Sequence, residues 1–225
     1  SMSELQKNLA KLALRLDRMG MQVGQAVDNG LKAIAERDIA AGEKVDEDDS
    51  RIDREEVEIE QECINLLALY QPTAIDLRRI CCVIKVNSDL ERIADIAARL
   101  GRRVKHIVVG NIRLETFPSY APLVAATREI LSLTVRMINS ADAELPRRVI
   151  AADFELDSAY AEFAREVLDA GRRATDIDTA LTLALLARSL ERIGDHCTNI
   201  AEDILFLITG EIIRHSASLK KHPPA

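Results

Sequence analysis

The sequence predicts an all-α protein built from two tandem antiparallel three-helix bundles. Apolar residues recur at spacings of three and four along most of the chain, which is typical of helices that bury one face. Glycine and proline are few, at 9 and 6 in 225 residues, so the chain lacks the punctuation that many short strands need. Motifs of the first half return in the second, which predicts two equivalent units related by a pseudo-twofold axis.

Three helices are expected in the first half. The first carries an apolar stripe over residues 5–34 and ends before a turn at 38–42. The second covers about 43–69 and ends before Pro72, because proline cannot continue a helix and restricts the residue before it. The third runs over about 73–107. These helices form the first predicted unit, residues 1–110.

The same pattern is expected in residues 111–225. An irregular stretch from Gly110 to Pro118 precedes it. Three more helices then cover about 119–141, a segment from near Pro146 to a C-cap at Gly171, and about 175–209 with Gly210 at its end.

The internal repeat is visible in the letters. Glu91-Arg-Ile-Ala-Asp95 returns as Glu191-Arg-Ile-Gly-Asp195, one hundred residues later. At an offset of 104, the repeated acids are Asp49 and Asp53, which return as Asp153 and Asp157, and Asp38, which returns as Asp142. We expect Asp38 to cap the second helix and Asp142 to cap the fifth.

Composition excludes several classes of function. A net charge of −7, scarce aromatic residues and the absence of tryptophan argue against a nucleic-acid partner. The four cysteines form no CxxC pair, so reduced thiols and a cytoplasmic location are expected. No apolar stretch approaches the roughly 20 residues that a membrane span needs. A cytoplasmic protein that reaches the membrane only through partners fits these observations.

Acidic residues four apart share a helix face, where like charges destabilise the helix unless something compensates them. If the second and third helices pack side by side, Asp49 and Asp53 face Glu91 and Asp95. Asp153, Asp157, Glu191 and Asp195 repeat this arrangement in the second half. Converging carboxylates suit Mg²⁺, Mn²⁺, Ca²⁺ or iron rather than a structural zinc ion.

The alternative is a salt-bridge network in which neighbouring bases, rather than a cation, compensate the acids. The candidate bases are Arg54, Lys85, Arg92 and Arg192. In the second half, Asn199 lies on the face of Asp195 and is a better auxiliary ligand than His196. In the first half, Arg99 takes the place of that asparagine, so cation binding there is expected to be equal or weaker.

The segment 43–62 carries eleven acids against three bases, a net charge of −8. Such a run is either a solvated helix face or a surface that attracts a basic partner.

The repeated motifs resemble those of the PhoU family. The residues that carry the resemblance are Leu190-Glu-Arg-Ile-Gly-Asp-His-Cys-Thr-Asn-Ile-Ala-Glu202, Asp89-Leu-Glu-Arg-Ile-Ala-Asp95, Asp49-xxx-Asp53 with Glu56, Leu66-Leu-Ala-Leu-Tyr-Gln-Pro72 and Asp76-Leu-Arg78. The resemblance implies two three-helix bundles and metal ions, including multinuclear iron clusters, held by the acid pairs named above. Ala94, Ile96 and Arg99 depart from the second-half motif, so the resemblance implies the second metal site more directly than the first.

The resemblance also implies a regulator that represses phosphate-uptake genes when phosphate is plentiful. Its expected partners are the ATPase subunit of a phosphate ABC transporter and a phosphate-sensing histidine kinase, and a homodimer is expected. We expect no catalysis, since no nucleotide-binding loop or nucleophile arrangement occurs. Two alternatives stay open. A ferritin-like di-metal enzyme would need Glu-x-x-His motifs, which are absent, and a metal-free helical adaptor would differ only in metal content.

Overall fold

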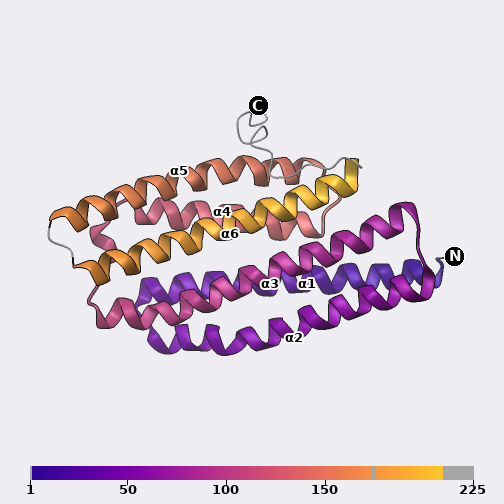
Figure 1. Ribbon diagram of the computed structural model, residues 1–225, viewed down its shortest axis with the longest axis horizontal. Coiled ribbons are helices and arrows are strands. Elements are labelled where there is room, and N and C mark those ends of the chain that lie inside the picture. The colour runs from indigo at the N-terminus through magenta and orange to yellow at the C-terminus, as the bar shows by residue number, and fades with distance from the viewer. Residues whose placement is uncertain (1, 174–175, 210–225) are drawn as a thin grey trace.

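The computed structural model describes residues 2–173 and 176–209, which form six α-helices and one short 3₁₀-helix (Figure 1). The elements are α1 (Glu4–Glu36), α2 (Ile39–Tyr70), α3 (Ala74–Val109), η1 (Leu114–Thr116), α4 (Tyr120–Ile138), α5 (Glu144–Arg173) and α6 (Ile177–Thr209). These residues contain no strand, so the predicted all-α class is confirmed. None of the described helices is both long and apolar enough to cross a membrane.

Four helices lie side by side in the order α2, α3, α6, α5, as Figure 1 shows. Helix α1 packs on α2 and α3, and α4 packs on α5 and α6. The two three-helix halves meet through α3 and α6 and through α1 and α4. Helices α3 and α6 run antiparallel, because Cys82 contacts Asp203 whereas Asp89, further along α3, contacts His196, earlier on α6.

Local sequence signals explain several helix ends. Asp38 caps α2 by accepting a hydrogen bond from the Ala41 N–H at 3.0 Å. Gln71 ends α2 in the left-handed conformation, just before Pro72. Asp142 accepts a hydrogen bond from the Glu144 N–H at 2.9 Å, at the start of α5. The caps that the repeat predicts therefore occur in both halves.

The predicted turn at 38–42 is wrong, because α2 already begins at Ile39. Gly42 lies buried inside α2 against Gly101 of α3. A Cβ atom on either residue would run into the carbonyl oxygen of the other. The glycine that resembles a turn signal is instead needed for the close approach of two helices.

Smaller differences occur in the second half. Gly171 is not a C-cap, because α5 continues to Arg173. The start of the sixth helix near 175 and the closing Gly210 lie outside the described residues. Helix α4 has 19 residues against 33 in α1. Tyr120, the first residue of α4, and Phe117 just before it pack on Phe163 of α5, with ring centroids 5.6 and 6.1 Å from that of Phe163.

Candidate metal centre

Three carboxylates converge between α2 and α3. Asp49 and Asp53 lie one turn apart on α2, and Asp95 faces them from α3. One oxygen from each lies within 4.8 Å of the other two. In the described part of the chain, this is the one group of three or more His, Cys, Asp or Glu side chains that meets this distance. The backbone contact of Gly42 and Gly101, about two turns away, holds the two helices close enough for this convergence.

The cluster concentrates negative charge in a half-buried position. Burial raises the pKa of Asp49 to about 6, and the charges of Asp53 and Asp95 add to the shift. Burial also raises the pKa of Glu91 to about 8, helped by a hydrogen bond to Asp95 and by the charges of Asp95 and Asp53. The pKa of Glu56 is raised by burial and then by Glu60, Asp53 and Asp95. Asp49, Glu56 and Glu91 therefore keep their protons to a higher pH than isolated carboxyl groups do.

Protein cations do not compensate this charge. Among the described residues, no Lys, Arg or His nitrogen lies within 4.0 Å of a carboxylate of Asp49, Asp53, Glu91 or Asp95. The Oδ1 atoms of Asp49 and Asp53 are shielded from solvent and have no hydrogen-bond partner in the described chain. Shielded, unpartnered carboxylate oxygens are costly unless a ligand satisfies them. The first cluster thus fits a hard cation better than a salt-bridge network.

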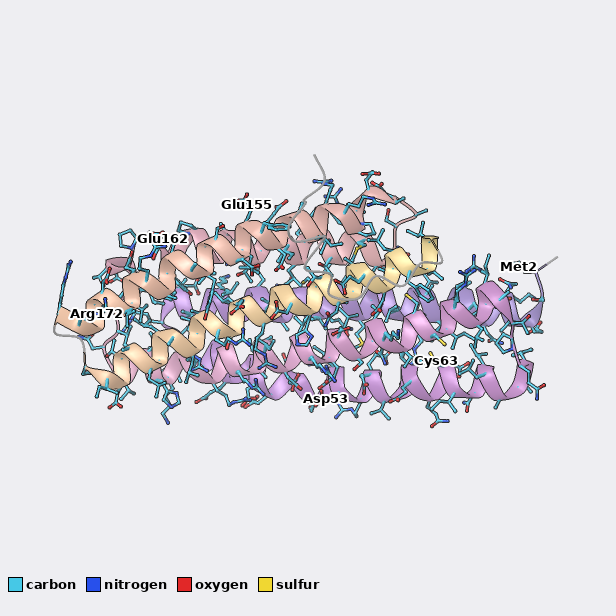
Figure 2. The ribbon with its side chains drawn as sticks, turned by 45° about the horizontal axis from the view of Figure 1, so that its top comes forward. Met2, Asp53, Cys63, Glu155, Glu162 and Arg172 are labelled. Atoms are coloured by element: carbon cyan, nitrogen blue, oxygen red, sulfur yellow. The ribbon has the colours of Figure 1, made fainter. Side chains whose placement is uncertain are left out.

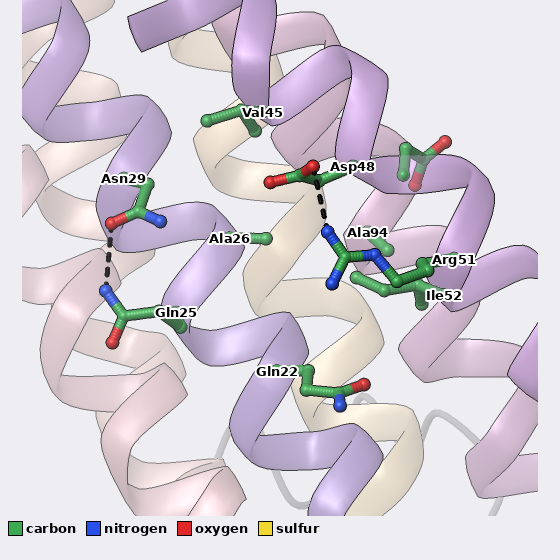
Figure 3. A pocket seen from close by; sticks show the side chains of 10 residues that line it. Gln22, Gln25, Ala26, Asn29, Val45, Asp48, Arg51, Ile52 and Ala94 are labelled. Carbon is green, nitrogen blue, oxygen red and sulfur yellow. Dashed lines mark hydrogen bonds and ion pairs between the residues drawn. The ribbon is translucent and has the colours of Figure 1, made fainter.

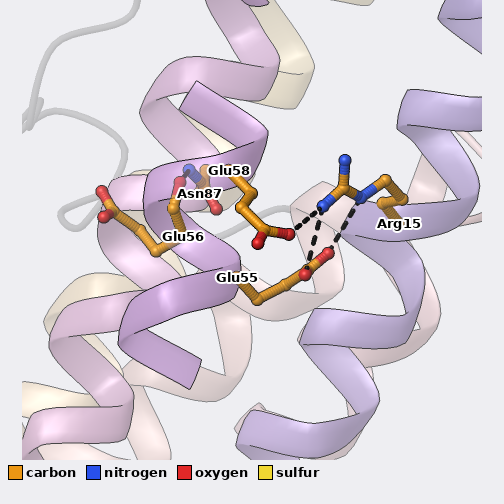
Figure 4. A network of polar contacts seen from close by, with 5 residues as sticks. All are labelled: Arg15, Glu55, Glu56, Glu58 and Asn87. Atoms are coloured by element: carbon orange, nitrogen blue, oxygen red, sulfur yellow. Dashed lines mark hydrogen bonds and ion pairs between the residues drawn. The ribbon is translucent and has the colours of Figure 1, made fainter. Parts of the chain in front are cut away.

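The acids on the α1 side of α2 have a different environment. Arg15 of α1 donates to Glu55 at 2.9 and 3.2 Å and to Glu58 at 2.9 Å (Figure 4). Asp48 binds Lys44 and Arg51, each at 3.1 Å. Arginine and lysine side chains therefore neutralise part of the negative charge of segment 43–62. The acids that they pair with, Asp48, Glu55 and Glu58, are not metal candidates.

A cavity lies between α1 and α2 beside the cluster, as Figure 3 shows. Its α1 wall carries Gln25 and Asn29, whose amides bond each other at 2.9 Å. Its α2 wall carries the paired Asp48 and Arg51. Asp49 of the carboxylate cluster also lines this cavity, so one uncompensated carboxylate borders it, whereas Asp48 is paired with Arg51.

The second-half acids are arranged differently. Glu191 accepts a hydrogen bond from Arg188 at 2.8 Å. Asp153 is only 1% exposed and lies against α6, where a Cβ on Gly194 would be 2.9 Å from its Oδ1 atom. Asp157 and Asp195 are half-buried. These acids do not form a group within 4.8 Å among the described residues, so their joint role as ligands stays a prediction.

Asn199, the predicted auxiliary ligand, contacts the other half of the protein. Its Nδ2 donates to Asp89 Oδ1 of α3 at 3.3 Å, and His196 Nδ1 lies 2.9 Å from the same oxygen. The Asn199 Oδ1 atom is shielded and has no hydrogen-bond partner in the described chain. Only this oxygen is available to a cation, so the assignment of Asn199 also stays a prediction.

One residue of the first-half site is absent from the sequence prediction. Asn87 of α3 is 1% exposed, and its Nδ2 donates to the carbonyl oxygen of Glu56 at 2.9 Å. A search for paired acids passes over a neutral amide. The sequence feature that could have identified Asn87 is its position, four residues before Glu91 and so on the same helix face.

Comparison with known proteins gives a consistent result. A family model described as the PhoU domain matches residues 16–104 and 123–204. A protein of Serratia marcescens named phosphate-specific transport system accessory protein PhoU is 32% identical over 206 residues, which cover 88% of this chain and 81% of that protein. A Caulobacter vibrioides protein named as its homolog is 34% identical over 217 residues, 91% of this chain and 90% of that protein.

Two crystal structures share the fold. PhoU from Pseudomonas aeruginosa superposes with a TM-score of 0.86 at 29% identity, over 92% of this chain and all of that one. The phosphate transport system regulatory protein PhoU from Streptococcus pneumoniae superposes with a TM-score of 0.80 at 23% identity, over 94% of this chain and all of that one. The second likeness concerns the fold alone.

Proposed function

The chain belongs to the PhoU family, and from this premise we propose that it couples phosphate uptake to phosphate-dependent signalling by binding other proteins. Members of this family are accessory proteins of phosphate transport rather than enzymes, so a role in regulating phosphate transport follows. The observation that carries the proposal is the family match, which covers segments of both three-helix halves.

The proposed partners are the ATPase subunit of a phosphate ABC transporter and the histidine kinase that senses phosphate. The names of the relatives, which refer to a phosphate-specific transport system, support the first partner. Both partners operate at the cytoplasmic face of a membrane, so the protein would be cytoplasmic and would reach the membrane by contact. We also propose that it forms a homodimer, since long amphipathic helices often bury remaining apolar surface in this way.

Three exposed acids of α2 offer contacts to a basic partner. Glu43, Glu47 and Glu60 are exposed, and no described ion pair involves them. They are the exposed acids of segment 43–62 that described ion pairs leave uncompensated. Such a surface speeds association with a basic patch at low salt and loses this effect as salt screens the charges.

Metal ions are the second part of the proposal. We propose that the first-half cluster of Asp49, Asp53, Glu91 and Asp95 holds divalent or trivalent cations, with iron, Mg²⁺, Mn²⁺ and Ca²⁺ as the candidates. The shielded oxygens without partners support this assignment. In the second half, the Arg188–Glu191 pair supports the metal-free alternative for at least one acid.

The test of the contact is a pull-down of the ATPase subunit and the kinase at low and at high salt. Glu43→Lys, Glu47→Lys and Glu60→Lys together are expected to weaken binding at low salt. The matched control reverses three exposed acids elsewhere, Glu115→Lys, Glu129→Lys and Glu155→Lys; Figure 2 shows Glu155 on the outer side of α5. Failure of the unmodified protein to bind either partner, with unchanged phosphate-gene expression in a deletion strain, would contradict the proposed regulatory function.

A further inference from the structure

A cavity of about 600 Å³ lies where the end of α3 meets the start of α6, at the left of Figure 1. Its α3 wall carries three basic side chains, those of Arg103, Lys105 and His106. Its α6 wall carries the hydroxyl groups of Thr179 and Thr182. Sites that hold small molecules have volumes of about 300–1,000 Å³, so this junction between the two halves has room for a small ligand.

Arg103 is a half-buried cation without a partner. Its Nε atom is shielded from solvent and has no hydrogen-bond partner in the described chain. No carboxylate oxygen of the described residues lies within 4.0 Å of its guanidinium group. Burial lowers the pKa of Arg103, and the charges of Arg99 and Arg102 lower it further. A cation in such a place is costly unless an anion pairs with it.

The internal repeat shows what an equivalent position looks like when it is paired. At the repeat offset of one hundred residues, Arg103 corresponds to Asp203, and Leu185 corresponds to Lys85. At that other junction of α3 and α6, Lys85 Nζ lies 4.0 Å from Asp203 Oδ1. Arg103 and Leu185 both line the cavity, but leucine cannot pair with a cation. One junction is therefore closed by an ion pair, whereas the other leaves a cation beside a cavity.

The acids beside the cavity do not neutralise its bases. Asp176 accepts hydrogen bonds from the Thr179 N–H at 2.7 Å and from the Thr179 hydroxyl at 3.3 Å, so it caps α6. Asp178 is exposed. Neither acid has a Lys, Arg or His nitrogen within 4.0 Å in the part of the chain that the structure describes. The bases of the α3 wall are thus left to an anion from outside the chain.

We propose that this cavity binds a phosphate group, with Arg103 as the principal donor. A guanidinium group is planar and matches two oxygens of a phosphate group at once. The ammonium group of Lys105, the imidazole of His106 and the two threonine hydroxyls can donate to the remaining oxygens. At the repeat offset, Lys105 and His106 correspond to Leu205 and Phe206, so the other junction lacks all three bases.

The surroundings of the cavity suit a phosphate group that carries an organic substituent. Val109, Leu181 and Leu185 line it and are exposed apolar side chains. The phosphate group can belong to the free ion or to the headgroup of an anionic lipid, and the test separates these two sources. The site lies about two helical turns beyond Asp95 on α3. It goes beyond the proposed regulatory role and does not rest on metal binding.

The test uses metal-depleted full-length protein with a chelator present, so that phosphate cannot bind through a cation of the carboxylate cluster. Isothermal titration calorimetry with inorganic phosphate is expected to show one saturable site. Arg103→Gln is expected to weaken binding at least about tenfold, because it removes a hydrogen bond between charged groups. Arg147→Gln is the matched control, since it removes the same charge from an exposed position near the start of α5, and it should leave binding unchanged.

A second set of variants keeps Arg103 in place and so does not depend on the folding of Arg103→Gln. Leu185→Glu puts a carboxylate where Lys85 stands at the other junction, and it is expected to pair with Arg103 and compete with phosphate. Leu185→Gln has the same size without the charge and should retain binding. Asp178→Asn removes a nearby negative charge and should tighten binding. Equal affinity for phosphate in Leu185→Glu and Leu185→Gln would contradict the proposal.

Cosedimentation with vesicles of phosphatidylglycerol and phosphatidylcholine identifies the source of the phosphate group. Vesicle binding that Arg103→Gln weakens, without binding of inorganic phosphate, assigns the site to a lipid headgroup. Phosphate binding without vesicle binding assigns it to the free ion. Binding of neither probe, or binding that Arg103→Gln leaves unchanged, overturns the proposal.

Discussion

His196 Nδ1 lies 2.9 Å from Asp89 Oδ1 across the interface of α6 and α3, a contact that occurs once although the halves are repeats. At the repeat offset of one hundred residues, Asp89 corresponds to Ser189 and His196 corresponds to Ile96. Ser189 bonds the carbonyl of Leu185 in its own helix instead of α3. The junction between the halves is therefore polar at one of two equivalent positions and apolar at the other.

Removing one member of this pair is expected to be costly. Asp89→Ala leaves His196 and the Asn199 amide without their shared acceptor in a buried place, which costs about 1–3 kcal/mol of stability. The double variant Asp89→Ser with His196→Ile copies the other equivalent position and is expected to cost less than the sum of the single changes. Urea unfolding of the parent, Asp89→Ser, His196→Ile and the double variant gives the coupling energy. Strict additivity would show that the two side chains do not act as a pair.

Gly101→Ala is expected to destabilise the first half. The added methyl group meets the backbone of Gly42, which cannot rotate away as a side chain can, and overpacking of this kind costs about 1–3 kcal/mol. Gly171→Ala is the matched control, because the new Cβ finds its nearest neighbour, Ala180 Cβ, at an ordinary 3.8 Å. We expect the control to raise stability by about 0.4–1 kcal/mol. Equal melting temperatures for the two variants would contradict the packing argument.

The stability of the metal-free protein is expected to depend on pH through Asp49 and Glu91. Burial raises the pKa of Asp49 to about 6 and that of Glu91 to about 8, whereas carboxyl groups of an unfolded chain titrate near about 4. The folded state therefore binds protons more tightly. The stability that these groups contribute is complete below about pH 4 and is lost as the pH rises through 6 and 8.

Thermal unfolding in the presence of a chelator measures this effect. The variant Asp49→Asn with Glu91→Gln stays neutral at every pH, so its melting temperature relative to the parent is expected to rise between about pH 5 and pH 8.5. A difference that does not change with pH would show that the two carboxyls are not perturbed in the folded protein.

Much of the fold could be predicted from the sequence because long helices carry redundant signals. Apolar periodicity, the proline after α2 and the repeated caps at Asp38 and Asp142 all indicate the same boundaries. Gly42 is the exception, since a glycine at a turn and a glycine at a helix crossing are identical in sequence. Only the approach of Gly101, 59 positions away in the chain, distinguishes them.

The sequence pattern indicates which acidic residues share a helix face, but it does not indicate the hydrogen-bond partners of the neighbouring amides. Spacing of four residues places Asp49 with Asp53 on one face, and the structure brings Asp95 to them. The role of Asn87 depends on which carbonyl its amide meets, and the role of Asn199 depends on Asp89 of the other half. Such contacts between helices leave no mark at a fixed spacing in the sequence.

The last prediction concerns which cluster stabilises the protein when metal binds. The sequence predicts equal or stronger binding in the second half, because Arg99 occupies the first. The structure shows no ion pair between Arg99 and the first-half acids among the described residues, and it pairs Glu191 with Arg188. We therefore expect the first cluster to account for most of the metal-dependent stability.

Chelation is expected to lower the melting temperature of the unmodified protein, since a cation that binds only the folded state stabilises it by about 2.7 kcal/mol at one hundred times its dissociation constant. Asp49→Asn with Asp53→Asn should abolish most of this difference and lower the metal content of the purified protein. The matched pair, Asp157→Asn with Glu191→Gln, should retain most of both. The reverse result would assign the metal to the second half. It would also mean that Arg188 leaves Glu191 when the cation binds.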